Sequence, residues 1–318
     1  MALAGLGPGD VLVLRALGLG DALTGVAALR GVRRAWPGRR VVLAGPAAVG
    51  GWFVRLGVVD AVVPTVGLDQ PLAVGGAGGH VAVNLHGRGP QSHRLLAATA
   101  PSQLVAFACA EAGHPASVAP EYRADEHEVA RWCRLLASAG GECGPEDLRL
   151  PVEAATDSAD AVVLHPGAAS GSRRWPVERW HDLARRLSAA GHRLLVTGSP
   201  AEAQLCAEVA GDVARSVAGE CDVPGLAALV AGARLLVCGD TGVAHVATGV
   251  GTPSVLLFGP TAPTTWGPAL DEDRHVVLWH GDGTGDPHAD ELDPALAAIT
   301  VAEVEQAVTA LVARQPAR

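Results

Sequence analysis

A chain of 318 residues is long enough for two hydrophobic cores, so we expect two domains of about 150 residues each. Hydrophobic residues make up 49% of the chain and charged residues 18%, and this composition excludes intrinsic disorder. The formal net charge of −9 excludes a strongly basic protein, and we expect no nucleic-acid partner.

The cysteines and the start of the chain predict a soluble, cytoplasmic protein. The six cysteines have no C-x-x-C spacing, which favours neither a zinc site nor a disulfide framework. Residues 1–9 lack the positive start of a signal peptide, and Asp10 and Arg15 interrupt the apolar run that follows. The nearly uncharged run 243–260 contains too many glycines and prolines for a membrane-spanning helix. Peripheral contact with the inner face of a membrane stays open.

Alternating strand and helix patterns predict a parallel sheet in each half of the chain. In the first half, the apolar run 10–21 predicts a buried strand, which Gly18 and Gly20 break before a helix over 22–36. The other elements expected in this half are strands at 40–45, 61–64 and 80–87 and a helix over 125–139. The second half predicts strands at 161–167, 193–198, 234–239 and 254–259, and helices over 176–190, over 201–209, from about 241, and over 301–314.

The regular alternation of strands and helices is interrupted over 119–151, so we place the domain junction near 151–160 and expect domains over 1–155 and 156–318. The amphipathic last helix is expected to pack on one of the domains, and packing back on the first is one option. Because parallel sheets bind ligands outside the carboxyl ends of their strands, we expect the two sheets to face a substrate cleft between the domains.

The first candidate residue is Asp21, which follows the first strand of the chain. Gly18 and Gly20 let the backbone turn tightly there and leave Asp21 at the mouth of the cleft, near the start of a helix. A simpler interpretation is that Asp21 only caps this helix, because Asp is among the preferred N-cap residues.

Small and cationic residues after the first strand of the second half predict a phosphate-binding loop. The small-residue loop that contains Ser170 and Ser172 lets backbone amides approach a phosphate closely. Arg173 and Arg174 add two guanidinium groups, whose fork matches phosphate geometry.

The sequence DTGVAH at 240–245 predicts a second anion site, because it follows a strand and opens a helix. Asp240, Thr241 and Gly242 stand where the backbone amides and the positive end of the helix dipole point at an anion. His245 lies four residues after Thr241, on the same face of the helix.

Three segments, 15–37, 165–187 and 239–268, resemble glycosyltransferase family 9, the ADP-heptose:lipopolysaccharide heptosyltransferase family. The resemblance implies an α/β protein of the GT-B fold, with two Rossmann-like domains that bind the acceptor and the donor respectively. It implies an inverting, metal-independent glycosyltransferase without a cofactor. The implied donor is a nucleoside diphosphate sugar, with an ADP-sugar favoured, and the implied acceptor is a hydroxyl of a glycan or glycolipid.

The resemblance also gives roles to individual residues. Asp21 corresponds to the catalytic aspartate, which takes the proton of the acceptor hydroxyl. Donor contacts correspond to Asp240, Thr241, Gly242 and His245, and the leaving diphosphate is stabilised by amides and cations as it is by a divalent metal elsewhere. Arg173 stands where the family usually has lysine, and the cysteines that many heptosyltransferases carry before a segment like 293–304 are absent. The missing cysteines, in a chain whose basic residues are all arginine, argue against assuming a lipopolysaccharide core acceptor.

Other polar segments are weaker candidates. Glu220 stands where the nucleotide ribose or base would lie, and a solvated loop carboxylate is an equally good interpretation. His86, Arg88 and Gln91 follow a strand of the first domain and would line the acceptor pocket, with a polar surface loop as the alternative. The acidic stretch 279–294 does not fit the EF-hand spacing, so we expect a solvated loop and no metal site.

Two alternatives to sugar transfer stay open. An epimerase or hydrolase of the same fold would use the same donor half without an acceptor, and a non-catalytic protein would only bind the nucleotide sugar. A nicotinamide dehydrogenase is disfavoured, because Leu23 stands where G-x-G-x-x-G requires its last glycine.

Overall fold

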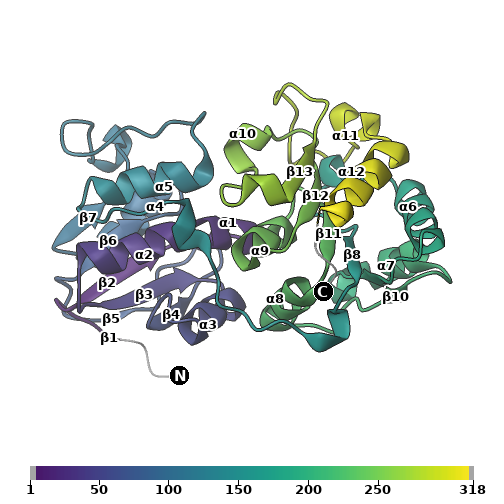
Figure 1. Ribbon diagram of the computed structural model, residues 1–318. Coiled ribbons are helices and arrows are strands. Elements are labelled where there is room, and N and C mark those ends of the chain that lie inside the picture. The colour runs from purple at the N-terminus through teal and green to yellow at the C-terminus, as the bar shows by residue number, and fades with distance from the viewer. Residues whose placement is uncertain (1–4, 315–318) are drawn as a thin grey trace. The chain divides into compact units, whose positions relative to one another are not determined.

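The structure is a computed structural model that describes residues 5–314 (Figure 1). The chain divides into two compact units, the first ending at Leu148 and the second beginning at Arg149. This division falls slightly before the boundary expected near residue 155. Each unit contains an all-parallel sheet flanked by helices.

The main sheet of the first unit has the strand order β4-β3-β2-β6-β7. Its strands are β2 (Asp10–Leu14), β3 (Arg40–Gly45), β4 (Ala61–Pro64), β6 (Val81–Asn84) and β7 (Gln103–Val105). A small sheet pairs β1 (Gly5–Leu6) with β5 (Gly75–Gly76). The helices are α1 (Leu19–Thr24), α2 (Val26–Ala35), α3 (Ala47–Arg55), α4 (Gln91–Ala97) and α5 (Glu128–Ala137). Residues 11–14 of the central β2 are all fully buried, as a strand covered on both faces requires.

The sheet of the second unit has the order β10-β9-β8-β11-β12-β13. Its strands are β8 (Val162–His165), β9 (Leu194–Val196), β10 (Arg215–Ser216), β11 (Leu235–Gly239), β12 (Ser254–Leu257) and β13 (His275–Leu278). Its helices are α6 (Val177–Ala189), α7 (Ala203–Ala210), α8 (Val223–Gly232), α9 (Gly242–Val250), α10 (Pro263–Trp266), α11 (Pro294–Ala298) and α12 (Val301–Ala313). Trp175 and Trp180 pack edge to face in the core, with ring centroids 5.2 Å apart.

The start of the chain differs from the sequence expectation in two ways. The strand expected over 10–21 ends at Leu14, because the chain turns away before α1 begins at Leu19. The helix expected over 22–36 is two helices, α1 and α2, which meet at Gly25. Gly20 therefore lies inside α1 and not in the turn that precedes it.

Several elements were not anticipated from the sequence. The helix α8 is apolar along most of its length, so its sequence carries no amphipathic period. The helix α3 begins with small residues and contains Gly50 and Gly51, which disfavour a helix. The strands β7 and β10 have only three and two residues, too few for a recognisable alternation.

The last helix, α12, packs on the second unit. A capping box between Thr300 and Glu303 fixes its start, and Val304, Val308 and Leu311 lie in the core of the second sheet. These contacts support packing on the second domain, one of the two options that the sequence left open. The apolar face expected from the sequence is the face that is buried.

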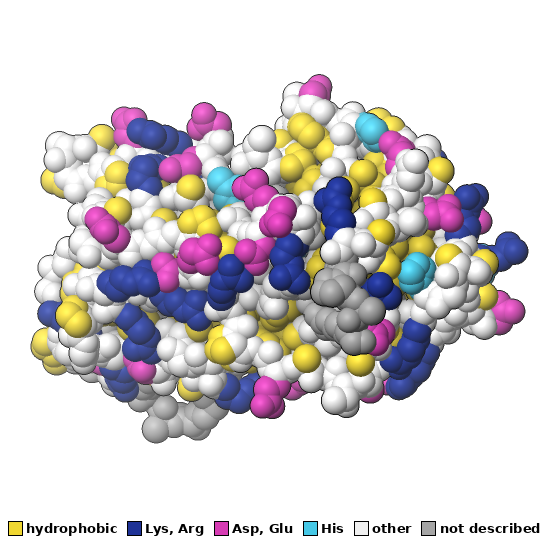
Figure 2. All heavy atoms as spheres, viewed as in Figure 1, with side chains coloured by type: hydrophobic (Ala, Val, Ile, Leu, Met, Phe, Trp, Pro, Cys, Tyr) yellow, Lys and Arg dark blue, Asp and Glu magenta, His cyan; other side chains and the backbone are white. Residues whose placement is uncertain are grey.

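Charged side chains of both signs are interspersed on the face of the molecule shown in Figure 2. Arg33 of α2 pairs with Asp60 at 2.9 Å, and Arg186 of α6 pairs with Asp182 at 3.0 Å. Such exposed pairs contribute little to stability, typically less than about 1 kcal/mol. Each of these two arginines therefore has a carboxylate beside it.

Candidate functional site

Asp21 is the third residue of α1, at the carboxyl edge of the first sheet. The N-cap of α1 is Gly18, so the interpretation of Asp21 as the N-cap residue is wrong. The Asp21 carboxylate lies near the residue that precedes the helix. A Cβ placed on Gly18 would be 3.8 Å from Asp21 Oδ2. Gly18 has φ −62°, a conformation open to any residue, so the expected tight glycine turn is not what places Asp21. The positive end of the helix dipole favours the ionised carboxylate there.

His86 follows β6, the strand next to β2, and its imidazole is fixed by the chain around it. Its Nδ1 accepts a hydrogen bond from the Ala16 amide at 3.1 Å, and its own amide donates to Asn84 Oδ1 at 3.0 Å. Burial and the nearby Arg15 charge lower the pKa of His86 to about 4. The imidazole is therefore neutral near pH 7, with its proton on Nε2. Arg88 and Gln91, the other two expected acceptor-side residues, are exposed.

The loop before Arg173 contacts a later segment of the second unit. The Ser170 hydroxyl donates to the Pro287 carbonyl, and the Ser172 amide donates to the Ala289 carbonyl at 3.0 Å. A Cβ on Gly171 would lie only 1.7 Å from the Asp290 carbonyl oxygen, so only glycine allows this close approach. The segment 287–290 thus lies directly on the loop. Residues 287–290 of the stretch 279–294 are therefore packed against this loop, while the phosphate contacts expected from Ser170 and Ser172 stay a prediction.

Arg173 joins the two motifs of the second unit that the sequence predicts to bind an anion. Its Nε donates to Ser170 Oγ at 3.1 Å, and its Nη1 donates to the carbonyl of Asp240 at 3.2 Å. Arg174 is exposed and donates to the carbonyl of Ala168 at 2.9 Å, so it turns back along its own loop. The structure therefore brings Arg173, and not Arg174, to the DTGVAH motif.

The DTGVAH motif begins where β11 ends, at the carboxyl edge of the second sheet. Asp240 is buried, and Thr241 is the N-cap of α9 without a side-chain bond to the first turn. Gly242 is the first residue of the helix. The His245 ring meets the Trp266 ring at a centroid distance of 6.1 Å and an angle of 62°. Trp266 was not anticipated, since nothing in its short segment marks it as a neighbour of α9.

The remaining expected donor residue, Glu220, is exposed. Its carboxylate pairs with Arg215 at 2.8 Å, in the loop between β10 and α8. Among residues 5–314, no three His, Cys, Asp or Glu side chains are grouped so that they could hold a metal ion. Over the same residues, no helix has the length and hydropathy needed to cross a membrane.

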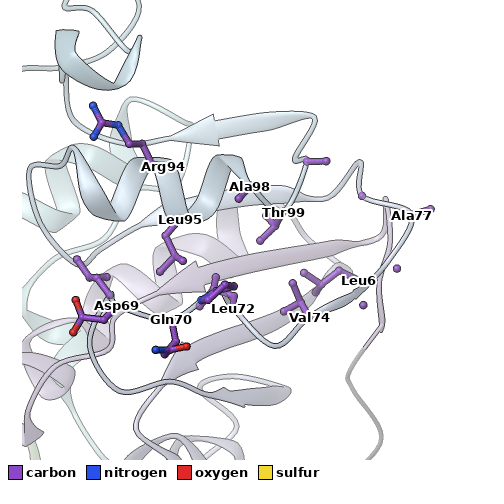
Figure 3. Close-up of a pocket in the computed structure, with 16 residues that line it drawn as sticks. Leu6, Asp69, Gln70, Leu72, Val74, Ala77, Arg94, Leu95, Ala98 and Thr99 are labelled. Atoms are coloured by element: carbon purple, nitrogen blue, oxygen red, sulfur yellow. The ribbon is translucent and has the colours of Figure 1, made fainter.

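A cavity of about 550 Å³ in the first unit lies away from Asp21 (Figure 3). Leu6, Leu72, Val74 and Leu95 form its apolar wall, under α4 and beside the small sheet of β1 and β5. Because Leu6 precedes β2, this end of the cavity lies toward the amino ends of the strands. Parallel sheets hold their ligands at the opposite ends, so the cavity does not mark the candidate site.

Buried histidines predict a loss of stability in mild acid. Burial lowers the pKa of His86, His165 and His275 to about 4. An unfolded histidine titrates near about 6.5, so between these values the unfolded chain binds protons that the folded chain does not. The free energy of unfolding therefore keeps its full value above about pH 6.5 and decreases as the pH falls toward 4. The buried His165 alone accounts for a decrease of about 3 kcal/mol. Urea titrations at pH 7.5 and 4.5 measure this fall.

The variant His165→Gln tests this assignment, because it removes one of these protonation penalties. We expect the free energy of unfolding to fall less between the two pH values in His165→Gln than in the parent. His288→Gln is the matched control, since His288 is exposed. The same fall in all three proteins would contradict the role of His165.

The family model of glycosyltransferase family 9 (heptosyltransferase) matches residues 116–288, more than half of the chain. The chain belongs to glycosyltransferase family 9. It is similar to lipopolysaccharide heptosyltransferase 1 of Pseudomonas aeruginosa, with 33% identity over 146 residues. That match covers 43% of this chain and 41% of the relative, so it spans less than half of the relative's length.

Solved structures give the fold over almost the whole chain. The family 9 glycosyltransferase from Veillonella parvula has a TM-score of 0.77 at 17% identity, covering 99% of this chain and 100% of that chain. The E. coli heptosyltransferase WaaC, solved with ADP, has a TM-score of 0.73 at 19% identity, covering 95% of this chain and 99% of that chain. These likenesses confirm the GT-B fold that the sequence predicts.

Proposed function

We propose that the protein is an inverting glycosyltransferase that moves a sugar from a nucleoside diphosphate to a hydroxyl acceptor. The first unit binds the acceptor and the second binds the donor. The Asp21 carboxylate takes the hydroxyl proton while the acceptor oxygen bonds to the anomeric carbon. The bond from that carbon to the diphosphate oxygen breaks, and the diphosphate leaves with its electron pair. Attack from the face opposite the diphosphate inverts the anomeric centre.

The observation that carries this proposal is the contact between Arg173 and the Asp240 carbonyl, at 3.2 Å. A guanidinium group and the start of α9 reach the same carboxyl edge of the second sheet from distant parts of the sequence. Both features suit a diphosphate, which gains charge as it leaves. In the first unit, Asp21 supplies the base that a protein which only binds nucleotide sugars does not need.

The donor in this proposal is an ADP-sugar, in keeping with the family. The structural relative WaaC was solved with ADP, and its name describes a heptosyltransferase. The acceptor is a hydroxyl of a glycan or glycolipid, reached from the cytoplasm at the inner face of a membrane. In this proposal the donor is contacted by Arg173, by Glu220 at the nucleoside, and by Asp240, Thr241, Gly242 and His245.

A thermal-shift comparison of ADP, GDP, UDP and dTDP tests the donor assignment. A ligand at about 100 times its dissociation constant stabilises the native state by about 2.7 kcal/mol, so ADP should raise the melting temperature most. The matching sugar nucleotide is then assayed with and without candidate acceptors. Release of ADP only when an acceptor is present supports transfer, and equal release without any acceptor supports the hydrolase or epimerase alternative.

Chelation should leave transfer unchanged, because cationic and backbone groups take the place of a metal in this proposal. We expect initial rates in excess EDTA to stay within about twofold of the untreated rate. Loss of activity in EDTA that is restored by magnesium or manganese would contradict metal independence. The acidic segment from Asp282 to Asp293 would then be the first region to examine for ligands.

A further inference from the structure

Arg15 directly follows β2, and its charged side chain is only 1% exposed. Its Nη2 donates to Thr24 Oγ1 at 2.9 Å and to Glu128 Oε1 at 3.1 Å. Its Nε and Nη1 donate to the backbone carbonyls of Asp21 and Leu85. One guanidinium group therefore joins β2, α1, the residue after β6 and α5.

Glu128 balances the buried charge of Arg15. Its Oε2 also pairs with Arg131, and its Oε1 accepts a hydrogen bond from Trp132 Nε1 at 2.6 Å. The Arg15 guanidinium carbon lies 5.1 Å from the centre of the Trp132 ring. The charge is thus paired, bonded and covered by an aromatic face.

Gly25, the residue between α1 and α2, lies directly against the Arg15 side chain. A Cβ on Gly25 would lie 2.7 Å from Arg15 Cδ and 2.8 Å from Arg15 Nε. The arginine side chain therefore passes through space that only glycine leaves free. Glycine stands at this junction in place of a residue that favours a helix, and it leaves room for the arginine side chain.

Stability alone is a weak reason for this arrangement. Buried ion pairs are often no more stabilising than apolar side chains of the same volume. The two carbonyls that Arg15 holds, however, belong to Asp21 and to the residue before His86. Asp21 is the candidate base and His86 is one of the acceptor-side candidates, and the Ala16 amide next to Arg15 holds the His86 ring.

We infer that Arg15 is a positioning residue, which fixes the start of α1 and the end of β6 so that Asp21 and His86 face the acceptor in one geometry. The inference rests on the proposed role of Asp21 as the base. Arg15 itself does not contact the reacting atoms. A misplacement of about 1 Å can cost about a hundredfold in rate, so loosening this clamp acts on turnover.

Arg15→Met removes the charge and the fork while keeping the volume of the side chain. We expect kcat to fall about 30-fold or more, with the KM for the donor and the affinity for ADP unchanged. Arg15→Lys keeps the charge and part of the hydrogen bonding, so it should recover part of kcat. Arg15→Ala leaves a cavity, and guanidinium at low millimolar concentration should restore its turnover in a saturable manner.

A readout that does not depend on activity separates this inference from the proposed function. The Arg15 charge is one of the two causes that lower the pKa of His86, so NMR titration of the His86 imidazole should show a higher pKa in Arg15→Met. If the parent protein transfers no sugar while this shift is seen, the proposed function fails and the contact stands. Folded Arg15→Met with kcat within threefold of the parent overturns the inference. If Arg15→Met does not fold, parent-like kcat in Arg15→Lys without any change in the His86 titration overturns it.

Discussion

Asp21→Asn is expected to lose transfer activity by about 100-fold or more while it binds the donor as well as the parent. The amide has nearly the size of the carboxylate but cannot accept the acceptor proton. Asp21 is the third residue of α1 in the first unit, whereas the proposed donor contacts belong to the second unit. Initial rates of acceptor-dependent ADP release measure the loss, and calorimetric titration with ADP measures donor binding.

Asp125→Asn is the matched control for this experiment, because it changes an exposed carboxylate of the same unit. It should leave both quantities unchanged. The loss of one favourable charge near a helix start costs only about 0.3–1 kcal/mol, so Asp21→Asn should fold. Turnover near that of the parent in folded Asp21→Asn would reduce Asp21 to a residue that merely favours the helix start.

Arg173→Ala should weaken nucleoside diphosphate binding by about tenfold or more, because one charge-assisted contact is typically worth about 1.5–3 kcal/mol. Nucleoside binding should change much less, since a nucleoside carries no phosphate. Calorimetric titration with adenosine, AMP and ADP separates the two effects. Arg185→Ala, an exposed arginine of α6, is the control and should bind all three ligands as the parent does.

His245→Ala should show the same dependence on phosphate, with a larger effect on rate than on binding if its ring meets charge that grows on the leaving group. Arg173 also donates a hydrogen bond to the Asp240 carbonyl, so its loss could disturb the local structure as well as remove a charge. Arg173→Lys keeps the positive charge and helps to separate these two effects. Equal losses for adenosine, AMP and ADP would indicate a damaged second unit. Unchanged ADP affinity in both alanine variants would contradict the proposed donor pocket.

The carboxyl edges of the two sheets could be predicted from the sequence because the central strands are uninterrupted apolar runs. Residues 11–14 and 235–238 are fully buried, and the polar motifs come directly after such strands. Because β2 and β6 are parallel, Asp21 and His86, which follow them, lie at the same edge of the sheet. The exact start of α1 could not be predicted, because two glycines blur the helix signal before Asp21.

Contacts between distant segments account for what the sequence could not predict. The partners of Ser170 and Ser172 lie more than a hundred residues later, in a stretch without periodicity. In the sequence, Arg15 is only an interruption of an apolar run. The fold shows that its guanidinium group donates a hydrogen bond to Thr24 and pairs with Glu128. Local propensity carries no signal for such long-range pairs, since they depend on how the elements pack.

The contact between residues 287–290 and the loop of Ser170 also limits where the chain can be truncated or joined to another member of the family. A fragment ending at residue 288, where the family match stops, would lack the Ala289 carbonyl that binds the Ser172 amide and the Ile299 carbonyl that binds Trp175 Nε1. It would also lack α12 and would expose the part of the core on which α12 packs. Each orphaned buried donor costs about 1–3 kcal/mol, a large part of the roughly 5–15 kcal/mol that stabilises a domain. A chimaera that exchanges the donor half between two such enzymes must therefore carry everything from Arg149 through Ala313.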